Sequence, residues 1–338
     1  MAGGWRLSLF ALAGVVLSLR LCEDARWSGD VRWSASQMVL AAWPLAAPRF
    51  AERLEKRVLD RWHAERAGHV GRVFDVAVHA YGGPSDAHLD LSRPFVVRSL
   101  RGRAARNWNA TFFAKAPQGD VVVAYFADAA VGKEAGGLSP GARAPLGDVL
   151  KLLAGGARAK TGTEAVFRKF PQLLRQLPLR KLRKLFRYRP FAPAFVGSLL
   201  TVPLFASRGE AGKRVRTELH CEPIANVAVQ LQGSKVWTLV APSDSRGLRP
   251  KVALDGRGYI FADVDDVGHV DRYTVTTEPG DLLFVPTLWW HTVDYLPEVT
   301  SVAVSLFHVR PMQMMQHPLF TFTLLPNLVK ELVGWKTQ

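Results

Sequence analysis

Residues 279–291 read PGDLLFVPTLWWH, and this stretch says most about the fold of the chain. Its first three residues are a turn signal, and the β-prone run 282–285 follows them directly. Two tryptophans, Trp289 and Trp290, then lead to His291. Bulky apolar neighbours fix the orientation of a histidine ring and keep its surroundings dry, so the stretch predicts a strand followed, after Pro286, by a candidate metal-binding histidine.

A second stretch supplies partners for His291. Residues 217–222 read TELHCE, and in a strand residues two apart face the same way. His220 and Glu222 can therefore hold one metal ion while Cys221 points away. Two histidines and one carboxylate are the ligand set of non-haem Fe(II) oxygenases, which keep the opposite face of the metal open.

Three other His-x-acid triplets compete with this one: His63/Glu65, His88/Asp90 and His269/Asp271. The first lies in a stretch with helical spacing, where residues two apart point to nearly opposite sides. The other two lie in loop-like sequence without matching partners downstream. We expect ordinary surface or core histidines at all three places, because such short motifs often match by chance.

Two short β-prone runs, 226–231 and 236–239, lie on either side of Gly233 and predict a hairpin-like element. It would carry an inward polar group on each strand, Asn226 and Lys235. A lysine in an apolar strand is explained if it is buried beside an anion. The alternative is a solvated lysine, because the turn at Gly233 is only two residues away.

Taken together, these stretches resemble the JmjC or cupin-like 2-oxoglutarate oxygenases. The family pattern runs T-x-x-H-x-D/E, an asparagine four residues after the acid, a lysine in G-x-K-x-W/R, and P-G-D-x-L-F-V-P-x-x-W-W-H. RPFVVR at 93–98 and SVAVS at 301–305 resemble the first and closing strands of the family, so the resemblance covers about 91–310. It implies a mainly β fold, a double-stranded β-helix or jelly-roll barrel with flanking α-helices.

The resemblance also assigns roles to single residues. It implies that the catalytic Fe(II) ligands are His220, Glu222 and His291. It further implies contacts with 2-oxoglutarate by Thr217, Asn226, Lys235 and Ser305. A dianion inside a low-dielectric barrel needs a positive partner, which suits Lys235. Ser305 departs from the family, where asparagine is common, and serine donates one hydrogen bond from a shorter arm.

The function that follows is an Fe(II)- and 2-oxoglutarate-dependent dioxygenase that hydroxylates a protein side chain. Demethylation would result if the oxidised carbon carried a methylated nitrogen. The alternative is a catalytically silent barrel that acts as a lumenal or membrane-associated interaction protein. The sequence favours the enzyme, because all three ligands and Lys235 are present together.

The chain has 338 residues, of which 48% are hydrophobic, enough to bury one sizeable core. We expect four parts: a signal peptide or signal anchor (1–25), an N-terminal helical region (26–90), the barrel (91–310) with a basic insertion (157–190), and a C-terminal helical tail (311–338). An amphipathic helix near 47–66 is interpreted as a collar on the barrel, with a partner-binding helix as the alternative.

The N-terminus bears on location. The apolar run 7–19 matches a signal-peptide core and is shorter than the roughly 20 residues of a membrane span. No small-x-small cleavage site follows, so an uncleaved anchor is an alternative, and a buried N-terminal helix is a third. The sequon at Asn109 would suit the secretory lumen. We therefore expect the secretory pathway, in the lumen of the endoplasmic reticulum or anchored to its membrane.

Charge is concentrated in one segment. Residues 158–189 contain eleven Lys and Arg against the single acid Glu164, which is +10 of the formal net charge of +15. The part LPLRKLRKLFRYRP (177–190) spaces leucines as in a basic amphipathic helix, suited to an anionic membrane surface or an acidic partner. A solvated insertion is the alternative. Nucleic acid is disfavoured, because charge without a binding module is non-specific.

Overall fold

A computed structural model describes residues 68–80, 89–98, 107–127, 141–177, 179–186, 189–190, 198–248, 250–252, 260–264 and 266–315, together with Asp60 and Ala64. The segment 1–25 and most of the predicted helix 47–66 lie outside this part, so the interpretations of both stay predictions. Within the described residues, no helix has the length and apolar character needed to cross a membrane.

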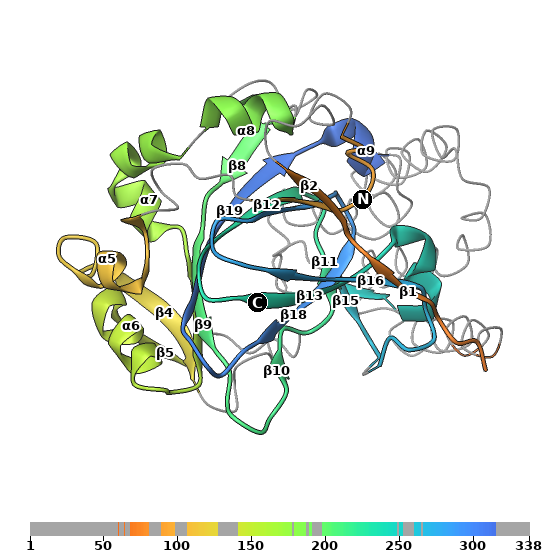
Figure 1. Cartoon of the computed structure of the whole chain (residues 1–338), viewed down its shortest axis with the longest axis horizontal. Coiled ribbons are helices and arrows are strands. Elements are labelled where there is room, and N and C mark those ends of the chain that lie inside the picture. Colours follow the sequence, from red (N-terminus) through yellow and green to blue (C-terminus); the bar gives the residue numbers. More distant parts are fainter. Residues whose placement is uncertain are drawn as a thin grey trace, which may run out of the picture.

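Two mixed β-sheets form the centre of the described structure (Figure 1). In spatial order, the smaller sheet consists of β1 (Val73–Asp75), β16 (Arg272–Thr277), β13 (Lys235–Val240), β18 (Trp290–Tyr295), β11 (His220–Cys221), β15 (Ile260–Ala262) and β14 (Pro250–Val252), with β10 (Val215–Arg216) beside β18. The larger sheet consists of β2 (Ala77–Ala80), β3 (Phe95–Arg98), β17 (Leu282–Val285), β12 (Ala225–Gln232), β19 (Ser301–Val309), β9 (Leu204–Arg208), β6 (Ala159–Thr163), β4 (Val122–Ala127) and β5 (Ala142–Pro145), with β8 (Ser198–Thr201) beside β19 and β7 (Arg189–Pro190) beside β8.

The chain alternates between the two sheets. β12 pairs with β17 and β19, whereas β13 pairs with β16 and β18. This is the winding of a double-stranded β-helix, and the predicted jelly-roll barrel is confirmed. The predicted hairpin around Gly233 is wrong. That turn, where φ is +64°, carries the chain from one sheet to the other, and a strand–turn–strand pattern fits either arrangement.

Alternation along each strand separates two apolar cores. In β12, Val227 and Val229 pack in a core shared with the helices, whereas Asn226 and Ala228 face the space between the sheets. β19 alternates in the same way and turns Ser305 inward. Because successive strand side chains point to opposite faces, polar groups reach the barrel interior without disturbing the helix-covered core.

Helices cover the outer face of the larger sheet (Figure 1), as the resemblance implied. They are α5 (Ala110–Ala114), α6 (Leu146–Ala154), α7 (Ala165–Lys169), the 3₁₀ helix η5 (Pro171–Gln176) and α8 (Leu179–Leu185); η7 (Pro242–Leu248) and α9 (Pro311–Met315) lie elsewhere along the chain. Asn109 of the predicted sequon caps α5, because its Oδ1 accepts the N–H of Phe112 at 2.8 Å.

Residues 73–80 fall in the region predicted to be helical, but they form β1 and β2. These strands extend the two sheets by parallel pairing with β16 and β3. The β-branched residues Val73, Val76 and Val78 explain the preference for strand over helix.

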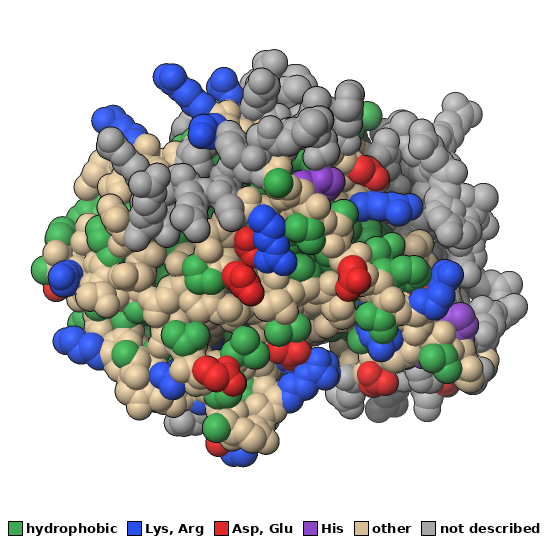
Figure 2. Space-filling view, viewed as in Figure 1, with side chains coloured by type: hydrophobic (Ala, Val, Ile, Leu, Met, Phe, Trp, Pro, Cys, Tyr) green, Lys and Arg blue, Asp and Glu red, His purple; other side chains and the backbone are tan. Residues whose placement is uncertain are grey.

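The basic segment 158–189 is only partly an insertion, because it begins with β6, a strand of the larger sheet. In α8, Leu182 and Leu185 are buried in the core, whereas Arg180, Lys181 and Arg183 are exposed. Figure 2 shows basic side chains at the edge of the molecule where α8 lies. Since the buried leucines are used for packing, α8 offers charge rather than an apolar face to any partner.

A stack of three aromatic rings joins this helical layer to the barrel. The Phe284 ring lies 5.1 Å from that of Phe95 on β3 and 5.3 Å from that of Phe186, which follows α8. We expect Phe284→Ala to lower the free energy of unfolding by about 3–5 kcal/mol, because it opens a cavity in the packed core. Urea unfolding measures the change, and Val122→Ala on the exposed side of β4 is the control. A loss below about 1 kcal/mol would contradict this account of the core.

Candidate metal centre

His220, Glu222 and His291 come together at one end of the barrel interior. One potential ligand atom from each lies within 4.8 Å of the others. His220 on β11 is the direct cross-strand partner of His291 on β18, and their ring centroids are 4.4 Å apart. Glu222 follows β11 immediately, so strand alternation places it on the side of His220 while Cys221 is buried in an apolar cluster.

Backbone carbonyls orient both imidazoles. His220 Nδ1 lies 2.7 Å from the carbonyl oxygen of Glu218, and His291 Nδ1 lies 3.1 Å from that of Trp289. A carbonyl only accepts, so Nδ1 carries the proton in each ring and Nε2 is left as the ligand atom. His220 Nε2 lies 3.9 Å from Glu222 Oε1. A fixed tautomer and ring direction are what metal-binding histidines need.

Burial sets the charge of the cluster. It lowers the pKa of His291 to about 4, so this imidazole is neutral at pH 7 and able to coordinate. Burial also raises the pKa of the Cys221 thiol well above its ordinary value, with a further contribution from the Glu222 charge. Cys221 therefore stays a neutral thiol that faces away from the cluster.

A strained turn at Leu288 precedes His291 in the chain. Leu288 adopts a φ of +60°, which is uncommon for a residue with a branched side chain, and its N–H donates to the carbonyl of Glu222 at 2.9 Å. The indoles after it are anchored as well, since Trp289 Nε1 donates to the Ser92 carbonyl and Trp290 Nε1 to Ser245 Oγ. The turn thus fixes Glu222 and His291 to each other.

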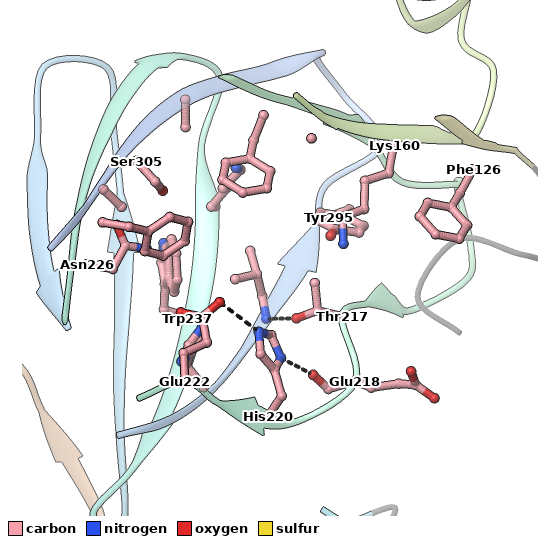
Figure 3. Close-up of a pocket in the computed structure, with 18 of the residues that line it drawn as sticks. Phe126, Lys160, Thr217, Glu218, His220, Glu222, Asn226, Trp237, Tyr295 and Ser305 are labelled. Atoms are coloured by element: carbon pink, nitrogen blue, oxygen red, sulfur yellow. Dashed lines mark hydrogen bonds and ion pairs between the residues drawn. The ribbon is translucent and has the colours of Figure 1, made fainter. Parts of the chain in front are cut away.

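A cavity of about 220 Å³ opens between the sheets beside this cluster (Figure 3). Its lining includes all seven of the predicted site residues: Thr217, His220, Glu222, Asn226, Lys235, His291 and Ser305. The structure therefore brings together every residue singled out from the sequence.

Lys235 is the most informative of the cavity residues. It is only 5% exposed, so the alternative of a solvated lysine is wrong. Burial, together with the charge of Lys160, lowers its pKa to about 7. Its Nζ lies 5.8 Å from the ring centroid of Phe205. A buried ammonium is costly unless an anion is bound beside it, so Lys235 indicates an anionic ligand.

Three polar groups complete the lining. Thr217 Oγ1 accepts the N–H of Val293 at 2.8 Å, which leaves its own proton for another acceptor. Asn226 is 4% exposed, and its Oδ1 has no hydrogen-bond partner among the described residues. Ser305 is 3% exposed and faces the same cavity. An unpaired buried amide oxygen also points to a group that binds here.

The competing triplets do not form such a cluster in the described residues. His269 Nε2 lies 2.6 Å from the carbonyl of Gly247, and Asp271 pairs with Arg72, so both have structural partners. His63, Glu65 and His88 lie outside the described residues.

Sequence reasoning missed several cavity residues, among them Lys160, Phe126, Phe205 and Tyr295. Lys160 was counted only as part of the basic segment. The signal for it was the pattern AKTGT at 159–163, a short strand in which Lys160 and Gly162 share one face.

Comparison with known proteins agrees with this geometry. The pattern of the family described as "Cupin-like domain" matches residues 85–314, so the chain belongs to the cupin-like family, as its resemblance to JmjC proteins implied. The individual relatives match over shorter stretches. HSPB1-associated protein 1 homolog from Danio rerio is 35% identical over 85 residues, which cover 22% of this chain and 19% of that protein.

Two further relatives extend the comparison. Human HSPB1-associated protein 1 is 33% identical over 85 residues, covering 22% of this chain and 17% of that protein. The tRNA wybutosine-synthesizing protein 4 of Gibberella zeae is 33% identical over 107 residues, covering 31% of this chain and 10% of that protein. In each case the match spans less than a fifth of the relative.

Proposed function

We propose that the protein is an Fe(II)- and 2-oxoglutarate-dependent oxygenase that hydroxylates a protein side chain. The donor set fits the metal, because two neutral imidazoles and one carboxylate leave the remaining positions of a ferrous ion open. His220, Glu222 and His291 would hold the ion.

The rest of the cavity fits the co-substrate. Lys235 supplies a buried cation for the distal carboxylate, and the Thr217 hydroxyl has a proton to donate to the same group. Asn226 would face the metal-bound end with its amide. These are charge-assisted or buried hydrogen bonds, which are the strong kind in a low-dielectric site.

Together with a 2-oxo acid and oxygen, bound Fe(II) supplies the oxidising power to hydroxylate an unactivated C–H bond. The chain's own residues orient the groups and limit the access of water. Trp237 and Val293 line the cavity with apolar surface, and the anchored indoles of Trp289 and Trp290 keep the turn before His291 in place. A substrate that enters the cavity would meet a fixed site.

The observation that carries this proposal is the coexistence of the three-ligand cluster and the buried Lys235 in one cavity. The test is release of succinate from 2-oxoglutarate by the purified chain with Fe(II), with and without candidate substrates. We expect slow uncoupled turnover that requires Fe(II). The absence of both turnover and a metal-dependent rise in melting temperature would overturn the proposal.

The name of one relative, tRNA wybutosine-synthesizing protein 4, suggests transfer RNA as a second substrate class. The same assay can distinguish a tRNA substrate from a protein substrate. Peptide pools and total tRNA are supplied in parallel, and products are analysed for a gain of one oxygen. We expect stimulation by peptides. Stimulation by tRNA alone would refute the protein side-chain part of the proposal while keeping the oxygenase part.

A second candidate function is protein association without catalysis. The name of the animal relatives, HSPB1-associated protein 1, favours it. The exposed basic side chains of α8 offer a surface for an acidic partner. Under this alternative the buried Lys235 has no explanation, and for that reason we place catalysis first.

We expect 2-oxoglutarate affinity to depend on pH through Lys235. The pKa of its ammonium is about 7, and the dianion binds the protonated form. Affinity should be constant below pH 7 and fall about tenfold per pH unit above it, until the higher pKa of the bound state is reached. Calorimetric titrations between pH 6 and 9 with Mn(II) in place of iron measure this. Affinity that is constant up to pH 9 would contradict a titrating Lys235.

A further inference from the structure

Lys160 enters the cavity from a strand that the site described so far does not use. On β6, Lys160 and Gly162 face the cavity, while Thr161 faces the other way and its Oγ1 donates to the carbonyl of Ala124 at 2.8 Å. Figure 3 shows the Lys160 side chain extending into the cavity next to Tyr295. A second ammonium group therefore shares the space with Lys235.

The two lysines meet at the same end of the cavity. Tyr295 on β18 is the direct cross-strand partner of Lys235 on β13, and Lys160 Nζ lies 5.9 Å from the centroid of the Tyr295 ring. The Phe205 ring lies beside Lys235 Nζ and fills the space left by Gly162, where a Cβ atom would come within 2.6 Å of it. Aromatic faces thus flank both amines.

Lys160 and Lys235 are the two ammonium side chains of the described cavity lining. The carboxylates of that lining are Glu222, which belongs to the metal cluster, and Glu218, whose side chain extends away from the cavity centre in Figure 3. Two like charges in a low-dielectric space repel each other, and a bound anion would relieve that repulsion.

We propose that Lys160 is a second cation for the carboxylate that binds Lys235, so that a lysine pair selects 2-oxo acids with a distal carboxylate. This inference rests on the proposed function. A carboxylate has two oxygens and about four acceptor sites, so two ammonium groups can each donate to it. Lys160 would act as a specificity-determining residue, outside the metal cluster and on a different strand from Lys235.

The test compares two ligands that differ only in that carboxylate: 2-oxoglutarate and 2-oxopentanoate. Both are titrated into the Mn(II)-loaded full chain and into Lys160→Met, which has a similar length and no charge. We expect Lys160→Met to weaken 2-oxoglutarate binding about tenfold, the size of one lost hydrogen bond to a charged group. Binding of 2-oxopentanoate should change less than twofold, and Lys160→Arg should restore most of the loss.

Two controls sharpen the comparison. Lys151→Met removes one positive charge from the exposed face of α6 and should leave both affinities unchanged. If Lys160→Met fails to fold, Lys160→Gln repeats the test with a polar, uncharged side chain. Unchanged 2-oxoglutarate affinity in a folded variant, or equal losses for both acids, would overturn the inference.

The pH dependence of 2-oxoglutarate binding shows whether Lys160 acts as a charge in the cavity or only supports the structure. The titratable groups that line the cavity with Lys235 are Lys160, Glu218, His220, Glu222, His291 and Tyr295. Because Lys160 lowers the pKa of Lys235, its removal should shift the pH midpoint of 2-oxoglutarate binding upward. An unchanged midpoint would count against the lysine pair. Wild-type protein that binds neither acid would instead refute the proposed function itself.

Discussion

Replacing His220 or Glu222 by alanine is expected to abolish metal binding and succinate formation while the protein still folds. Removing a residue that only supports a metal ligand typically costs 10–100-fold, so loss of a ligand itself should exceed about 100-fold. Metal-free stability should change by no more than about 1–2 kcal/mol, because the main apolar core lies on the other face of the larger sheet. Mn(II) titration and thermal unfolding measure the two effects.

The matched control is His69→Ala, at an exposed histidine far along the chain from the cluster. It should leave metal affinity, turnover and melting temperature unchanged. Wild-type metal affinity in either ligand variant, or failure of both variants to fold, would show that these side chains have another role.

Lys235→Met is expected to separate co-substrate binding from metal binding. A buried charge that loses its partner costs about 3–5 kcal/mol, which corresponds to a 2-oxoglutarate affinity lower by about 10²- to 4 × 10³-fold. Mn(II) affinity in the absence of 2-oxoglutarate should change less than about threefold, because Lys235 is not one of the clustered ligands. Titrations of each ligand on the same preparation measure both values.

The same substitution should stabilise the ligand-free protein. Burial lowers the pKa of Lys235 from 10.5 to about 7, so the unfolded chain binds more protons between these values and stability rises with pH across that window. A neutral, apolar side chain removes this cost, and we expect a melting temperature higher by about 2–4 °C for a gain on the order of 1 kcal/mol. Equal losses of metal and 2-oxoglutarate affinity, with lower stability, would indicate a structural role instead.

The barrel and its cluster were predictable because their signals are local. The run 282–285, the step from His220 to Glu222 and the aromatic pair before His291 depend on strand alternation and on neighbours in sequence. The burial of Lys235 also followed from local reasoning, because a lysine in an apolar strand needs an anion.

The features that the sequence did not predict are set by contacts between residues far apart in the chain. The turn at Gly233 has the same sequence signal whether the flanking strands pair or pass to different sheets, so the hairpin prediction failed. Lys160 lies in a segment of high charge. Its strand pattern puts it on one face with Gly162, but only the packing of β6 beside β9 shows that this face lines the cavity. The leucines of α8 have the spacing of a membrane-surface helix and of a core helix alike, and tertiary packing decides between the two.

The central claim is that one metal ion and one dianion bind side by side in this cavity. Calorimetric titration of the full chain with 2-oxoglutarate, in the presence and absence of Mn(II), tests it most directly. We predict one Mn(II) per chain and 2-oxoglutarate binding that requires the metal. Binding of 2-oxoglutarate with the same affinity in the absence of metal, or no binding of either ligand, would contradict the account.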